Sequence, residues 1–74
     1  MKYNELPKWA QKTVKQRVKN WFLMDANDAR QAGENVPYYT DEQLEFVTMQ
    51  YLNSKDDFDI EYDEETGLAE GVSF

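Results

Sequence analysis

The spacing of apolar residues changes once along this 74-residue chain, and that change constrains the fold more than any other feature. Up to residue 53, apolar residues recur every three or four positions, which is the period of an amphipathic helix. From Phe58 to Tyr62 they alternate with acidic residues, which is the period of a half-buried strand. The length fits one domain. The pattern predicts a small α+β domain of order α-α-β-β, with two helices packed on a C-terminal antiparallel β-hairpin.

The first helix is predicted over about residues 6–24, with Gly33 as an alternative C-terminal limit. Pro7 suits the first turn, where its missing N–H costs nothing. Residues 25–28 favour an interruption, because Asp and Asn prefer caps and turns to helix interiors. One arc of the helical wheel is apolar and the opposite arc is basic. The apolar arc holds Leu6, Ala10, Val14, Val18 and Trp21, and the basic arc holds Lys8, Lys12, Lys15 and Lys19.

A second helix is predicted over about residues 41–53. The sequence Asn35-Val36-Pro37 breaks the chain before it, and Thr40 and Gln43 have the spacing of a capping box. Phe46 and Met49 lie opposite the main apolar face of this helix, so they are either sandwiched or open to a partner.

The acidic β-hairpin is predicted over about residues 57–74. Residues 63–67 have the composition of a type I turn that Gly67 closes in the left-handed region. Leu68, Val72 and Phe74 continue as the return strand, which Gly71 weakens.

Charge divides the chain into a basic and an acidic part. Residues 1–24 carry six Lys or Arg and one acid, whereas residues 25–74 carry two and fourteen. Alternate strand residues point the same way about 6.6 Å apart, so the hairpin predicts a row of carboxylates. Such a row resembles a nucleic-acid backbone and suits a protein's basic nucleic-acid-binding groove; the alternative is a solvated edge strand. The acids assigned to partner binding are Asp56, Asp57, Asp59, Glu61, Asp63, Glu64 and Glu65.

Composition excludes several kinds of chemistry. The chain has no cysteine and no histidine, which removes thiolate nucleophiles, disulfides and the usual zinc ligands. A calcium loop beginning at Asp57 fails at Tyr62, where Gly is needed, and at Leu68, where Glu is needed. Paired carboxylates need a dry pocket for acid–base catalysis, and a small hairpin offers little of one. We expect no catalytic residue, metal site or cofactor, and so no enzyme.

Aromatic residues make up 15% of the chain, many for so small a core. Most are expected in the core, but aromatic residues are also enriched at binding hot spots. The side chains expected to be exposed for a partner are Tyr38, Tyr39, Phe46 and Met49.

The basic arc supports two further hypotheses. Lys8, Lys12, Lys15 and Lys19 suit phosphate contacts, with Trp9 stacking on a base. The formal net charge of −7 opposes direct nucleic-acid binding by long-range steering. The same lysines suit pairing with the chain's own acidic hairpin, within one copy or between copies of a homodimer.

Two stretches resemble a known family. Val36-Pro37-Tyr38-Tyr39, then a helix, then Phe58-Asp59-Ile60-Glu61-Tyr62-Asp63 is similar to a stretch of the Ocr-like phage antirestriction proteins. That family is small, acidic and dimeric, and mimics DNA to block nucleic-acid enzymes. The resemblance implies a phage or mobile-element protein acting on a host nuclease, polymerase or defence complex. Because the first helix is basic, it implies mimicry only in the C-terminal half.

These observations lead to one expected function. The chain is expected to be a non-enzymatic inhibitor whose acidic face occupies the nucleic-acid-binding groove of a host protein. The alternatives are a small regulator with a basic nucleic-acid-contacting helix and an acidic partner-binding half, or a self-associating structural protein. No apolar run approaches the about 18 residues of a membrane helix, and no secretory h-region is visible. A cytoplasmic location in a bacterial host, without membrane contact, is therefore expected.

Overall fold

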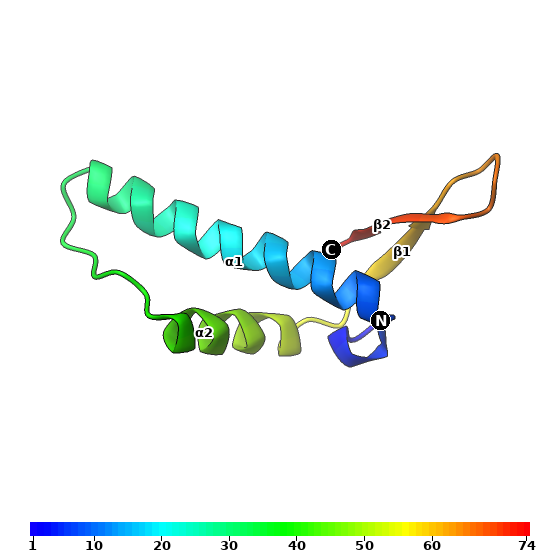
Figure 1. The fold of residues 1–74 in the computed structure, drawn as a ribbon, viewed down its shortest axis with the longest axis horizontal. Helices are drawn as coiled ribbons and strands as arrows, with labels where there is room; N and C mark the ends of the chain where they lie inside the picture. Colours follow the sequence, from blue (N-terminus) through cyan, green and yellow to red (C-terminus); the bar gives the residue numbers. More distant parts are fainter.

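The computed structural model describes all 74 residues, and its element order is the predicted α-α-β-β. The long helix α1 runs along the molecule, α2 lies beside it, and the two-stranded hairpin extends past the N-terminal end of α1 (Figure 1). The longest dimension is 48 Å. The elements are the 3-10 turn η1 (Tyr3–Glu5), α1 (Lys8–Gln31), α2 (Asp41–Asn53), β1 (Asp59–Tyr62) and β2 (Ala69–Ser73).

Helix α1 ends close to the alternative limit at Gly33, and the interruption expected at residues 25–28 is wrong. Ala26 is buried on the inner face, so packing holds this segment helical against the local preference of its Asp and Asn residues. The helix closes in a Schellman motif, in which Glu34 N–H donates to the Ala29 carbonyl at 3.0 Å. Gly33 has φ +92° there, a conformation that glycine adopts without strain.

Helix α2 spans the predicted range, and its capping box is present. The Gln43 N–H donates to Thr40 Oγ1 at 3.1 Å, and the Thr40 N–H donates to Gln43 Oε1 at 3.0 Å. These two bonds satisfy backbone donors that have no partner within the helix.

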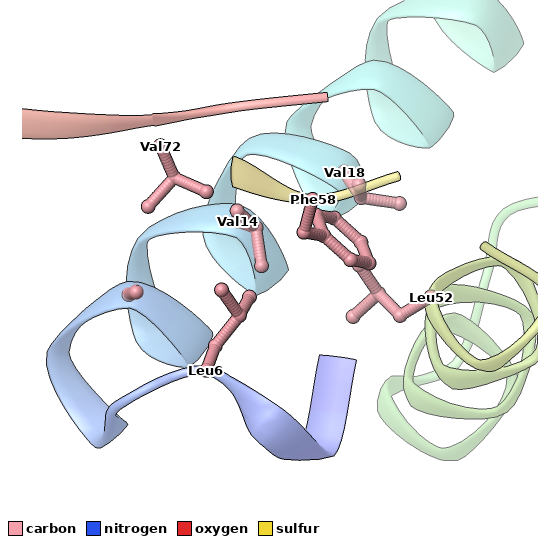
Figure 2. Packing of buried hydrophobic residues seen from close by; sticks show 7 residues of the cluster. Leu6, Val14, Val18, Leu52, Phe58 and Val72 are labelled. Carbon is pink, nitrogen blue, oxygen red and sulfur yellow. The ribbon is translucent and has the colours of Figure 1, made fainter. Parts of the chain in front are cut away.

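The core lies where α1, the end of α2 and the base of the hairpin meet (Figure 2). Phe58 is 2% exposed, and its ring lies 5.4 Å from that of Phe74 and 6.3 Å from that of Tyr3. The Phe58 N–H donates to the Met1 carbonyl, which ties the first residue to the start of the hairpin. The buried cluster consists of Leu6, Ala10, Val14, Val18, Leu52, Phe58 and Val72.

Trp21 departs from the predicted buried arc, because its side chain is 42% exposed. Its ring lies 5.2 Å from that of Phe74 and 6.4 Å from that of Tyr51, so it covers the margin of the core. Arg17 also covers this margin, and its guanidinium donates to the Val72 carbonyl at 3.3 Å. The outer edge of β2 is therefore held against α1.

The hairpin strands are shorter than predicted. Ile60 pairs with Val72, and a bulge between Glu61 and Tyr62 shifts the register toward the turn. Leu68, expected on the return strand, lies outside it and is 68% exposed. The predicted turn is present: Gly67 has φ +70°, and its N–H donates to the Asp63 carbonyl at 2.8 Å.

Candidate protein-binding surface

The hairpin, residues 58–74, carries six acidic residues and no basic residue. The ion pairs of the chain join Glu45 to Lys15 and Lys19, and Asp57 to Lys55. No hairpin carboxylate therefore has a cationic partner in the fold. The six acids are Asp59, Glu61, Asp63, Glu64, Glu65 and Glu70.

Two of these acids have structural contacts. Asp63 Oδ1 accepts hydrogen bonds from the backbone N–H groups of Glu65 at 2.8 Å and Thr66 at 3.1 Å. This Asx turn fixes the tip of the hairpin. Asp59 Oδ1 accepts from the Ile60 N–H at 3.0 Å. The side chains of Glu61, Glu64, Glu65 and Glu70 make no hydrogen bond or ion pair within the chain, and we call these four residues the free carboxylates.

The predicted row of carboxylates along the strand is short in the structure. Only Asp59 and Glu61 belong to β1, because Asp56 and Asp57 precede the strand and Asp63 enters the turn. Asp57 instead pairs with Lys55 at 3.2 Å, which raises the pKa of Lys55.

The predicted lysine face is divided between two environments. Lys15 and Lys19 turn toward α2 and pair with Glu45, Lys19 at 2.8 Å. Hydrogen bonds from these ammonium groups, that of Lys15 first, hold the pKa of Glu45 below its usual value. Lys8 and Lys12 remain exposed. Pairing with the acidic hairpin within one chain, one of the hypotheses for this arc, is wrong, because α2 supplies the partner.

Phe46 lies on the outer face of α2 and is 62% exposed, as one of the two predicted alternatives required. Met49 is half-buried and packs partly against the core, so it is less exposed than predicted. Both line an open groove of about 1000 Å³. Its lining residues are Lys19, Asp41, Glu42, Glu45, Phe46, Met49, Gln50, Asn53 and Ser54.

The two neighbouring tyrosines differ in exposure. Tyr38 is 81% exposed, and the Arg30 guanidinium lies 3.8 Å from the centre of its ring. Arg30 also donates to the carbonyls of Val36 at 2.8 Å and Pro37 at 3.0 Å, which fastens the loop to the end of α1. Tyr39 is half-buried, with its ring 6.5 Å from that of Phe22. Tyr39 is thus part of the packing, against the expectation that it is open to a partner.

The structure does not bring the predicted partner-binding residues together. The hairpin and the loop that carries Tyr38 lie toward opposite ends of the long axis, and α2 lies between them (Figure 1). An acidic surface and separate aromatic anchors therefore do not form one patch. Sequence reasoning missed the exposed hairpin residues Tyr62, Leu68 and Glu70. The available signal was chain length, since a chain of 74 residues has too small a core to cover both faces of a hairpin.

Comparison with protein-family profiles, curated proteins and solved structures finds no match to the chain. No helix of the structure combines the length and apolar character needed to cross a membrane. No group of three or more acidic side chains is arranged to hold a metal ion.

Proposed function

We propose that this protein is a non-enzymatic inhibitor that inserts its acidic hairpin into a basic groove of a nucleic-acid-handling protein. The main support for this proposal is that the hairpin projects from the helical body (Figure 1). Its six carboxylates have no cationic partner within the chain. Unpaired like charges on one small element repel each other, and a basic groove removes that repulsion on binding.

The division of charge within the fold supports this proposal over direct nucleic-acid binding. Lys15 and Lys19 are engaged by Glu45, and Arg17 donates to the Val72 carbonyl. These three cationic side chains are therefore engaged within the protein, whereas the free carboxylates face solvent. We propose the cytoplasm of a bacterial host, where such partners occur, as the site of action.

Two charge variants test the proposal. The hairpin variant combines Glu61→Gln, Glu64→Gln and Glu65→Gln, which leaves the turn-forming Asp63 intact. The control variant combines Asp25→Asn, Asp28→Asn and Glu34→Gln, in the C-terminal part of α1 and shortly after it. This end of α1 points away from the hairpin (Figure 1). Both variants remove three negative charges, so a difference between them reports the position of the charge and not the net charge.

The immobilised wild type is used to capture proteins from nuclease-treated bacterial lysate, which are eluted with a salt gradient. We expect a captured protein that binds DNA or RNA by itself and loses that binding when wild type is added. The hairpin variant should fail to compete, and the control variant should compete like wild type. A captured protein that holds nucleic acid and this protein together, or equal competition by both variants, overturns the proposal.

A further inference from the structure

The face of β1 that begins in the core continues beyond it. Ile60 and Tyr62 share this face, because alternate strand residues point the same way, and Phe58, directly before β1, continues the same alternation into the core. Phe58 is 2% exposed, Ile60 is half-buried and Tyr62 is 60% exposed. The Tyr62 ring makes no ring contact within the chain, whereas Phe58 lies between two rings. The apolar face therefore continues beyond the part that the core buries.

Tyr62 has apolar and acidic neighbours at this end of the hairpin. Ala69 is its cross-strand partner, and Leu68, beside Ala69, is 68% exposed. The free carboxylates Glu61 and Glu70 follow or precede this pair in the sequence and are exposed, and Glu61 projects from the face of β1 opposite to Tyr62. The hairpin end therefore presents an exposed aromatic ring on one face of β1 and an exposed carboxylate on the other.

We propose that this end of the hairpin occupies the base-stacking cleft of a single-strand nucleic-acid-binding protein; this rests on the proposed function above. Such clefts combine a basic groove that follows the backbone with aromatic side chains on which bases stack. Tyr62 takes the place of a base, and the neighbouring carboxylates take the places of phosphates. A protein groove that binds duplex DNA contacts mainly phosphates and has no aromatic platform on which an exposed ring can stack.

The hairpin end is also held in one conformation. Asp63 bonds two backbone N–H groups of the turn, its own N–H donates to the Leu68 carbonyl at 2.8 Å, and Gly67 closes the loop. A fixed turn reduces the entropy lost when the ring enters a cleft. The ring and its carboxylates are thereby presented at constant spacing.

Displacement of fluorescent nucleic acids from purified proteins tests the inference. One probe is an OB-fold single-stranded-DNA-binding protein loaded with oligo(dT), and the other is a histone-like duplex-binding protein loaded with a DNA duplex. We expect wild type to displace oligo(dT) and not the duplex. Tyr62→Thr should weaken displacement about tenfold or more, the scale of one stacked base, while Tyr62→Phe keeps the ring and the effect. Met24→Gln removes an apolar side chain of similar exposure, 62%, from α1 and should change nothing.

The outcomes separate this inference from the proposed function. Loss of displacement in the Glu61, Glu64 and Glu65 variant, with Tyr62→Thr still active, overturns the stacking role and keeps the acidic hairpin. Displacement of the duplex alone assigns the hairpin to a duplex groove and also overturns the inference. If neither probe is displaced the inference fails, and the capture experiment alone decides the proposed function. Circular dichroism of each variant checks that the fold is retained.

Discussion

The helical body and the hairpin use charge and apolar surface in opposite ways. In the body, Glu45 lies between two lysines, and Arg30 fastens a loop. In the hairpin, the carboxylates have no cationic partner, and the apolar face continues beyond the core to Tyr62. Interactions made inside a fold stabilise it, whereas groups left without partners are available to another molecule. Acidic residues alone therefore do not identify a binding surface. Whether their carboxylates have cationic partners within the fold matters as well.

The largest contrast is expected between the two ends of the alternating segment from Phe58 to Tyr62. Phe58→Ala removes a 2% exposed core ring and should cost about 3–5 kcal/mol, which is close to the whole stability of so small a domain. Tyr62→Ala, at 60% exposure, should cost less than about 0.5 kcal/mol. Urea unfolding followed by circular dichroism measures both. Similar losses at the two positions would show that the hairpin end is covered and would remove the contrast.

A smaller effect is expected at the turn, where one hairpin acid is structural. Asp63→Ala removes the acceptor of two backbone hydrogen bonds and should destabilise the protein by about 1 kcal/mol. Glu64→Ala, next to it, has no such contact and serves as the control. The same urea titration compares them. Equal stability of the two variants would mean that the Asx turn contributes nothing.

The ion pairs between the helices should contribute less. Glu45→Gln should lower the free energy of unfolding by less than about 1 kcal/mol, because these side chains are partly exposed and screened. The pKa of Glu45 is lowered in the folded state, so its contribution is complete above the usual value of 4.5. It is lost as the pH falls through the lowered folded-state pKa. Unfolding of wild type and variant between pH 3 and 7 (roughly the window in which carboxylates titrate) should converge at the acid end. A constant difference would assign the effect to packing.

The smallest effect should have the opposite sign. The Glu61→Gln, Glu64→Gln and Glu65→Gln variant should be more stable than wild type by a few tenths of a kcal/mol at low salt, since like charges on the hairpin repel. About 1 M salt should remove the gain, because it shortens the screening length to roughly 3 Å. Thermal unfolding at both salt concentrations provides the measurement. A loss of stability at low salt would show that these carboxylates have favourable contacts in the fold, against the unpaired state described above.

Much of the architecture follows from local patterns in the sequence. Three features are determined by residues close together in the chain and can be predicted from the sequence alone. They are the capping box at Thr40, the turn closed by Gly67 and the alternation from Phe58 to Tyr62. The α-α-β-β order follows from the same local signals, because helix and strand periods differ.

The tertiary structure alone decided how far these patterns extend and which groups meet. Ala26 is buried in the folded chain, and residues 25–28 stay helical against local preference. Glu45 and Lys15 are 30 residues apart, and nothing in their local sequence selects that pairing over one with the hairpin. The core covers Phe58 and not Tyr62, although both fit one alternating pattern. The physical reason is that burial and pairing depend on distances between remote segments, whereas periodicity records only the shape of one segment.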